Sequence, residues 1–404
     1  MSIVFLSPTG QVGGAEAALH EMLAGLRERH PSWSLRLIVA SEGPLVARIE
    51  ALGVPVDMLP FPSALARLGD WNLGTGFWPR VVFAARFTAA AWPAFTYFRR
   101  LRRVLDAQAP TVVHTNGLKM HLLGAWARPR GAAVVWHFHD YAGRRSVTAK
   151  LLRRTAHRCD AVVANSRSVA EDAQRTCGQH MKVYPVWNAV DLNRFSPLGP
   201  RLDLDALAGL PPASDDVLRV GLVATFARWK GHQTFLSALA LLPSSLRVRG
   251  YVIGGPIYET SGSQVTLTDL RRRAQDLGLG QRVGFTGFVE DSSSAIRSLD
   301  VVVQASTDPE PFGLVIAEAM ACGKAVVASR AGGAIELTES GTSALDYDPG
   351  DAQTLARRIE ELAADSLLRS RLGAAGRSTA ERCFTRARMA VELTPIYQNL
   401  AHAL

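Results

Sequence analysis

Two glutamates separated by seven residues, Glu310 and Glu318, form the pattern in this sequence that points most directly to chemistry. Prolines on both sides of Glu310 oppose a helix there, whereas the apolar run 312–322, which ends at Gly323, predicts a short helix. We therefore expect Glu310 in the loop entering this helix and Glu318 within its first two turns. Carboxylates accept paired hydrogen bonds from vicinal hydroxyls, and the free N–H groups of a helix N-terminus bind phosphate. The pattern predicts a site for a phosphorylated, polyhydroxylated ligand.

A basic loop, residues 226–232, is the second candidate, because it follows a predicted strand and precedes a predicted helix. Lys230 offers a point charge that could neutralise a leaving diphosphate, where negative charge develops on oxygen. Arg228 is a further candidate for the same phosphate. A lone lysine in a loop is usually only solvated, but Lys230-Gly231 opens a helix in the same half of the chain as the glutamate pair. We therefore interpret this loop as an anion site.

A glycine turn, Gly13-Gly14, follows the first predicted strand and opens the first predicted helix. Glycines allow close approach of the backbone to a ligand, and the dipole of the helix favours an anion there. The turn lacks the G-x-G-x-x-G spacing of dinucleotide dehydrogenases, which argues against a nicotinamide cofactor.

Two histidines, His137 and His139, stand at the end of a predicted strand and are followed by Asp140. The alternation of a strand places both on the same side. A histidine at this position can hydrogen-bond a sugar hydroxyl or act as acid or base near neutral pH. The alternative is a structural histidine that caps its own loop. The nearby histidines show no spacing typical of zinc ligands.

The composition limits the class of protein. A chain of 404 residues with 48% apolar and 20% charged residues predicts a globular protein of two domains. Its four cysteines form no C-x-x-C pair, which suits a reducing cytoplasm and argues against disulfides and zinc. The first residues predict a strand and no signal peptide. Two D-x-D sequences, 203–205 and 346–348, lie in a predicted linker and a predicted loop, so no metal site is expected.

Short apolar runs alternate with helical patterns along both halves, which predicts α/β units with parallel sheets covered on both faces. A Pro/Gly-rich stretch, residues 195–212, is the expected linker. Such sheets bind ligands beyond the carboxyl ends of their strands. The expected strands are residues 3–7, 35–40, 54–59, 112–114, 133–137 and 161–164, and then 218–224, 248–253, 283–285, 301–304 and 325–328.

The charge of the chain suggests an anionic partner, since 45 basic against 36 acidic residues give +9. An aromatic-rich run, residues 83–98, contains Arg86 and is interrupted by Pro93. A central arginine costs about 2.5–3.5 kcal/mol in a membrane span, so we expect an interfacial helix instead. The alternative is a core helix followed by a solvated basic turn. Headgroups of anionic lipids would contact the arginines that follow: Arg99, Arg100, Arg102 and Arg103.

Taken together, these motifs resemble those of the retaining glycosyltransferases of family 4, also called glycosyl transferases group 1. The resemblance spans nearly the whole chain, and its specific part is the second half, with the seven-residue gap between the glutamates; Gly13-Gly14-Ala15-Glu16 also matches the family's signature residue for residue. It implies the α/β fold called GT-B, in which two Rossmann-like doubly wound parallel-sheet domains face each other across a cleft. Residues 1–192 would then bind the acceptor and residues 213–384 the donor. A last helix, residues 385–404, would cross back to the first domain.

The resemblance also implies a role for each candidate residue. Lys230 would neutralise the diphosphate of the donor, Glu310 would orient its sugar, and His139 would contact that sugar from the acceptor side, so these three form the expected catalytic set. Glu318 would bind the ribose. The family usually has an arginine five positions before the lysine, where this chain has Thr225. The expected donor-binding residues are Gly14, Arg228 (as a substitute for that arginine), Lys230, Phe312, Gly313, Leu314 and Glu318.

The function that the resemblance implies is transfer of a sugar from a nucleoside-diphosphate sugar to an acceptor hydroxyl with retention of configuration, without a metal or a further cofactor. We expect a lipid-linked or glycan acceptor in bacterial surface polysaccharide or glycolipid synthesis, and a cytoplasmic enzyme peripheral to the inner face of the membrane. The alternatives are a nucleotide-sugar epimerase or a phosphorylase of the same architecture, and a basic module that binds nucleic acid.

Overall fold

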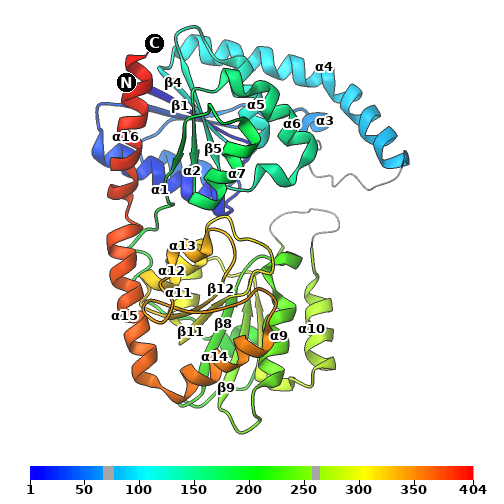
Figure 1. Cartoon of the computed structure of the whole chain (residues 1–404), viewed down its shortest axis with the longest axis vertical. Coiled ribbons are helices and arrows are strands. Elements are labelled where there is room, and N and C mark those ends of the chain that lie inside the picture. The colour runs from blue at the N-terminus through cyan, green and yellow to red at the C-terminus, as the bar shows by residue number, and fades with distance from the viewer. Residues whose placement is uncertain (67–76, 257–263, 404) are drawn as a thin grey trace. The chain divides into compact units, whose positions relative to one another are not determined.

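The computed structural model describes residues 1–66, 77–256 and 264–403, except for the side chains of residues 77–88 and 90. The chain forms two compact units (Figure 1). The first contains residues 1–189 together with residues 386–404, and the second contains residues 190–385. Each unit is built around one parallel sheet.

The first unit has a seven-stranded sheet in the order β3-β2-β1-β4-β5-β6-β7. All of its strand pairs are parallel. The order reverses at β1, which pairs with β2 on one side and with β4 on the other. The strands are β1 (Ser2–Ser7), β2 (Ser34–Val39), β3 (Val56–Met58), β4 (Val112–Asn116), β5 (Ala133–Phe138), β6 (Ala161–Ala164) and β7 (Val183–Pro185).

Helices cover both faces of this sheet, because alternate residues of its buried strands point to opposite sides. Phe5 of β1 belongs to the core that includes α1 and α16, whereas Leu6 belongs to the core that includes α4 and α5. Helix α16 packs against α1, and Arg386 of α16 forms an ion pair with Glu21 of α1. The helices of the unit are α1 (Gly14–Arg29), α2 (Pro44–Glu50), α3 (Ser63–Ala66), α4 (Phe77–Gln108), α5 (Leu118–Ala127), α6 (Ser146–Thr155), α7 (Arg167–Cys177) and α16 (Arg386–His402).

The second unit has a six-stranded parallel sheet in the order β10-β9-β8-β11-β12-β13, which reverses at β8. Its strands are β8 (Leu218–Val223), β9 (Val248–Ile253), β10 (Val283–Gly287), β11 (Val301–Gln304), β12 (Ala325–Ser329) and β13 (Leu345–Tyr347). Its helices are α8 (Leu204–Ala208), α9 (His232–Leu241), α10 (Leu267–Asp276), α11 (Ser292–Arg297), α12 (Leu314–Ala321), α13 (Ala334–Leu337), α14 (Ala352–Ala364) and α15 (Ser366–Cys383).

The predicted fold class is confirmed, since both units are doubly wound parallel sheets and every strand expected from the sequence is present. Two edge strands were not expected, β7 and β13. Each has three residues and includes a proline or an aspartate, so neither gives the continuous apolar run that indicates a buried strand.

The stretch 195–212, which we expect as the linker between the halves, packs on the second unit. Arg297 is 3% exposed and donates hydrogen bonds to the carbonyls of Pro200 (2.7 Å) and Arg194 (2.9 Å). Asp205 of α8 accepts hydrogen bonds from Arg249 and Tyr251 of β9, both at 2.6 Å. These hydrogen bonds hold the stretch along the second unit.

Pro93, which interrupts the aromatic run of the sequence, does not end the helix, because α4 continues through it as one helix of 32 residues. Proline removes one backbone donor and usually kinks a helix without always ending it. The first part of the predicted run, residues 83–88, lies in the stretch whose side chains are outside the described residues.

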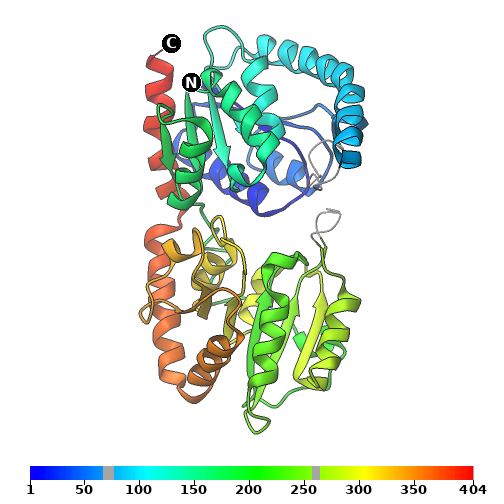
Figure 2. The same ribbon diagram turned by 45° about the vertical axis from the view of Figure 1, so that its right-hand side comes forward.

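The described part of α4 is amphipathic. Tyr97 and Leu101 are buried on one side, whereas Trp92 is 73% and Phe95 46% exposed on the other. Arg99 lies over the ring of Phe95 at 5.9 Å from its centroid, and Arg100 and Arg103 are also exposed. Figure 2 shows α4 (cyan) and α16 (red) on opposite sides of the first unit. Within the described residues, no helix is both long enough and apolar enough to span a bilayer.

Candidate functional site

The candidate site of the second unit lies where the strand order reverses, at β8. Ligands of doubly wound sheets bind beyond the carboxyl ends of the strands at this switch point. Lys230 ends a short 3-10 helix that follows β8, and Glu310 lies in the loop that follows the adjacent strand β11. Two predicted residues from distant parts of the sequence therefore meet there.

Lys230 and Glu310 form a partly buried ion pair. The Lys230 ammonium lies 2.9 Å from Oε2 and 3.0 Å from Oε1 of Glu310, which is only 6% exposed. Two neutral donors also reach this carboxylate: Gln304 through Nε2 at 3.2 Å, and Ser306 through Oγ at 2.6 Å. These hydrogen bonds and the ion pair offset the cost of burying the charged carboxylate, which would be high for an isolated one.

Gly231 is essential to the packing of the two loops against each other. Its φ of +72° is left-handed, and a Cβ at this position would lie 1.7 Å from the carbonyl oxygen of Ala305. The N–H of Thr307 also donates to the carbonyl of Trp229 at 2.8 Å. These contacts hold the loop after β8 directly on the loop after β11, and so fix Lys230 beside Glu310.

The predicted helix after Glu310 is present as α12, and Glu318 is its fifth residue, partly exposed. Gly313 precedes the helix with φ +96°, a left-handed value that favours glycine. Leu314 is the first helical residue. The side chain of Phe312 is buried against Phe384, so it belongs to the core. The first turn of α12 therefore begins four residues after Glu310, and the N-terminus of a helix favours an anion.

Arg228 does not join the pair in the structure. Its side chain is exposed, and its Nε donates to the carbonyl of Gln264 at 3.4 Å. Thr225, which stands where the family usually has arginine, lies in the same loop between β8 and the 3-10 helix.

The two D-x-D sequences have structural contacts. Asp203 caps the N-terminus of α8, and Asp205 is the buried partner of Arg249 described above. Asp346 and Asp348 both form ion pairs with Arg330.

In the first unit, Gly14 is the first residue of α1, directly after the loop that follows β1. The N–H of Gly13 donates to Oε2 of Glu16 at 3.1 Å, which closes the start of the helix. A Cβ on Gly14 would meet nothing within 4 Å. Its lack of a side chain is therefore not required by the packing of the chain itself, and leaves room for a ligand.

His139 follows β5 and belongs to a cluster of histidines at the carboxyl ends of β4 and β5. Its Nε2 lies 2.9 Å from Oδ1 of Asn116, the last residue of β4, and its ring is 4.0 Å from that of His137. The ring of His137 in turn hydrogen-bonds His114 at 3.2 Å, and His114 hydrogen-bonds the hydroxyl of Tyr397 at 3.0 Å. The prediction that His137 and His139 share one side of the strand is confirmed.

These histidines are neutral at pH 7. Burial lowers the pKa of His139 to about 4. Burial, and then repulsion from His139, lower the pKa of His114 to about 3, and the same causes hold the pKa values of His121 and His137 well below the ordinary range. A neutral imidazole with so low a pKa is a poor base, so hydrogen bonding suits the chemistry of His139 better than acid–base catalysis.

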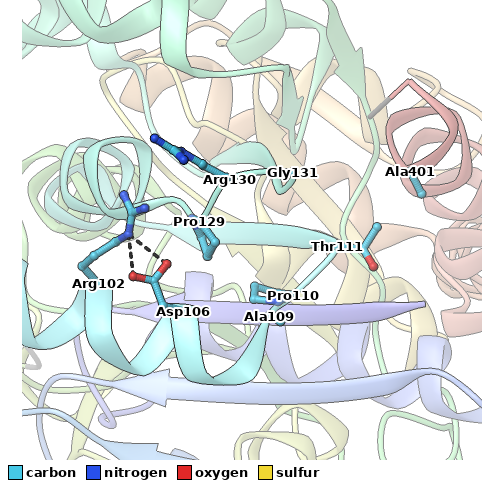
Figure 3. A pocket seen from close by; sticks show the side chains of 9 residues that line it. All are labelled: Arg102, Asp106, Ala109, Pro110, Thr111, Pro129, Arg130, Gly131 and Ala401. Atoms are coloured by element: carbon cyan, nitrogen blue, oxygen red, sulfur yellow. Dashed lines mark hydrogen bonds and ion pairs between the residues drawn. The ribbon is translucent and has the colours of Figure 1, made fainter.

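The four arginines of the predicted basic cluster on α4 differ in their contacts. Arg102 forms an ion pair with a carboxylate of its own helix. Its Nε lies 2.9 Å from both carboxylate oxygens of Asp106. Figure 3 shows this pair at the wall of a hollow of about 620 Å³, lined also by the turns that precede β4 and β5 and by Ala401. The hollow lies at the amino ends of these strands, opposite the edge that carries His139.

Sequence reasoning missed three polar residues of these sites: Gln304, Ser306 and Asn116. Gln304 and Asn116 are the last residues of buried strands, and Ser306 lies two residues after the strand that Gln304 ends. A polar residue that ends an apolar strand of a parallel sheet is the signal that could have found them.

Comparison with known proteins places both halves of the chain in one group. Residues 212–379 match the family described as "Glycosyl transferases group 1", and residues 12–194 match "Glycosyltransferase Family 4".

Three similar proteins illustrate the relationship. The lipopolysaccharide core biosynthesis glycosyltransferase LpsE of Rhizobium meliloti is 31% identical over 66% of this chain and 73% of that protein. The GDP-mannose-dependent alpha-(1-6)-phosphatidylinositol monomannoside mannosyltransferase of Mycolicibacterium smegmatis is 29% identical over 72% of this chain and 78% of that protein. The structure of Anabaena Alr3699/HepE in complex with UDP and glucose has a TM-score of 0.78 at 24% identity, covering 98% and 99% of the two chains. The chain therefore belongs to the group 1 glycosyltransferases of family 4, and it is a glycosyltransferase with the GT-B fold.

Proposed function

We propose that the protein is a retaining glycosyltransferase that transfers a sugar from a nucleoside-diphosphate sugar to an acceptor hydroxyl. The observation that carries the proposal is the contact between Lys230 and Glu310 at the switch point, directly before the first turn of α12. A cation and a helix N-terminus suit a diphosphate, and a carboxylate suits sugar hydroxyls. A similar fold bound to UDP and glucose in the Anabaena protein supports this class of donor.

Each residue has a proposed part. Lys230 and the N–H groups at the start of α12 neutralise the departing diphosphate, Glu310 orients the sugar, and Glu318 binds the ribose. His139, which is neutral, hydrogen-bonds a sugar hydroxyl. Gly14 gives the diphosphate close access to the backbone. The remaining proposed donor contacts come from Arg228, Phe312, Gly313 and Leu314, with Phe312 contributing only backbone because its side chain is buried.

Retention without a protein nucleophile is consistent with the state of Glu310. A carboxylate that accepts hydrogen bonds from lysine, glutamine and serine has its oxygen lone pairs engaged, and this lowers its nucleophilicity. We therefore propose that the leaving phosphate oxygen takes the proton of the acceptor hydroxyl, while the bond from that hydroxyl to the anomeric carbon forms on the face from which the phosphate departs.

The reaction is expected to need no metal ion, because Lys230 supplies the positive charge at the leaving group. Turnover should be unchanged, within about twofold, after dialysis against EDTA and assay in its presence. Loss of activity in EDTA that is restored by manganese or magnesium, and by neither buffer exchange nor added salt, would contradict this account of Lys230.

The function itself is tested by a screen of nucleotide-sugars, read first as thermal stabilisation of the protein and then as release of nucleoside diphosphate. A transferase releases nucleoside diphosphate fast only when an acceptor is present. An epimerase converts the donor without such release, and a phosphorylase depends on inorganic phosphate. If no nucleotide-sugar stabilises the protein or is turned over, the proposal fails.

We further propose that the acceptor is lipid-linked and that the enzyme works at the inner face of a bacterial membrane, in synthesis of a surface polysaccharide or glycolipid. The two curated relatives support this, since their names refer to lipopolysaccharide core and to phosphatidylinositol monomannoside. The exposed face of α4 supports it independently, because Trp92 and Phe95 are followed by Arg99, Arg100 and Arg103. Exposed aromatic rings beside arginines are typical of helices that lie in the headgroup region.

Binding of the protein to liposomes is expected to require anionic lipid and to fall with added salt. Each exposed arginine near such a surface contributes about 1 kcal/mol, so changing Arg99, Arg100 and Arg103 together to serine should weaken binding by about 10²-fold. Co-sedimentation measures this. Arg102→Ser is the matched control, because Arg102 is paired with Asp106 and should matter little. Equal sedimentation of wild type and triple variant would assign this face to another role and point to a soluble acceptor.

A further inference from the structure

Gln304, the last residue of β11, has both ends of its amide fixed. It is 3% exposed, its Oε1 accepts the N–H of Ser329 at 3.0 Å, and its Nε2 donates to Oε2 of Glu310 at 3.2 Å. Ser329 belongs to the adjacent strand β12. Since a backbone N–H can only donate, the amide oxygen must face β12 and the amide NH₂ must face Glu310. The orientation of the side chain is thus set by the sheet.

Ser306 completes the arrangement from the other side of the loop. Its hydroxyl donates to the same Oε2 of Glu310 at 2.6 Å, while its carbonyl accepts the hydroxyl of Ser329 at 2.7 Å. The carboxylate of Glu310 therefore has two neutral donors anchored on β11 and β12, in addition to the charged donor Lys230 from the loop after β8.

The neutral donors matter because Lys230 has two proposed tasks. In the ligand-free protein its ammonium compensates Glu310, and in the reaction it has to compensate a diphosphate. A carboxylate that is 6% exposed cannot lose much of the counter-charge that Lys230 supplies without another source of hydrogen bonds. Gln304 and Ser306 are in contact with Glu310 and can provide them.

We propose that Gln304 is a positioning residue for the transfer reaction: its amide N–H holds the carboxylate of Glu310, as an anion, in the orientation that contacts the donor sugar while Lys230 turns to the diphosphate. This inference rests on the proposed function. Gln304 does not touch the sugar itself; it acts through Glu310, with Ser306 as the second donor.

Gln304→Glu is the informative variant, because a protonated glutamic acid has the shape and the hydrogen-bonding pattern of glutamine. In the protonated form of the variant, the carbonyl of residue 304 accepts from Ser329 and its O–H donates to Glu310. In the ionised form two carboxylates are in contact, and they cannot both be charged at low cost. The ratio of the turnover number of this variant to that of the wild type should fall about tenfold or more when the pH is raised from about 6 to about 9. Gln304→Leu has no proton to lose, so its turnover should be reduced about tenfold at every pH. Ser306→Ala should lose a similar factor, also independently of pH.

Gln275→Glu, on the exposed surface of α10, is the control for an added carboxylate and should follow the wild-type pH profile. A structural role alone would lower stability in the Gln304 variants without a pH-dependent ratio of turnover numbers. If the ratio for Gln304→Glu is flat, or if both Gln304→Leu and Ser306→Ala keep wild-type turnover, the inference is overturned.

A measurement without catalysis separates this inference from the proposed function. Gln304→Leu should lower the melting temperature of the wild type more than that of a Glu310→Met background, because the contact exists only where the carboxylate is present. Equal shifts in the two backgrounds overturn the inference whatever the enzyme does. Unequal shifts in a protein that turns over no nucleotide-sugar would instead overturn the proposed function and leave the contact established.

Discussion

Replacing Lys230 with methionine should reduce turnover by about 10²–10³-fold, the loss typical of removing one preorganised group that stabilises charge developing in a transition state. Methionine keeps the unbranched, apolar chain of lysine and removes only the ammonium. Because the loop that carries this ammonium is locked by Gly231, only the side chain has to turn from Glu310, 2.9 Å away, to the leaving group. The turnover number at saturating donor measures the effect.

Two comparisons make this prediction specific. Lys230→Arg should recover part of the activity, since it restores the charge with a different geometry. Lys150→Met removes a lysine from the exposed surface of the first unit and should leave turnover unchanged. If Lys230→Met retains turnover within a few-fold of wild type, the leaving diphosphate is stabilised elsewhere and the central role of Lys230 is wrong.

Replacing Glu310 with glutamine should separate turnover from nucleotide affinity. Turnover should fall by about 10²-fold, because the neutral amide no longer forms the charge-assisted hydrogen bonds that orient the sugar. Affinity for free nucleoside diphosphate should stay constant or increase, since Lys230 is no longer held by an opposing charge 2.9 Å away. Calorimetry with the nucleoside diphosphate and steady-state kinetics with the whole donor measure the two quantities.

Glu339→Gln, an exposed glutamate of the same unit, is the control and should alter neither quantity. A parallel loss of nucleotide affinity and of turnover in Glu310→Gln would place Glu310 at the nucleotide and not at the sugar.

The sequence was sufficient for those parts of the site that depend on local pattern. The prolines around Glu310 and the apolar run after it predicted a loop carboxylate before a helix, and the structure has Glu310 before α12. Strand alternation placed His137 and His139 together. The parallel sheets followed from apolar runs separated by helices, because strands buried on both faces have no polar side.

What could not be predicted depends on contacts between distant residues. Nothing local indicates that Gln304 faces Glu310, since this follows from the hydrogen bond that fixes its other end on β12. The path of residues 195–212 is set by Arg297, about a hundred residues later in the chain. The neutrality of His139 depends on how completely the surrounding elements bury it, a quantity that no spacing in the sequence reports.

The packing of α16 on the first unit has a consequence for how the protein is made. Met389, Leu393 and Tyr397 are fully buried in a core that includes residues of β1, β2 and α1, near the beginning of the chain. At a translation rate of about 5–20 residues per second, the ribosome completes α16 some tens of seconds after α1 has emerged. During synthesis, the second unit has all of its residues available before the first, and one apolar face of the first unit stays uncovered until α16 has been made. Premature termination before residue 386 would leave that face exposed permanently, and such truncated chains should aggregate and be degraded.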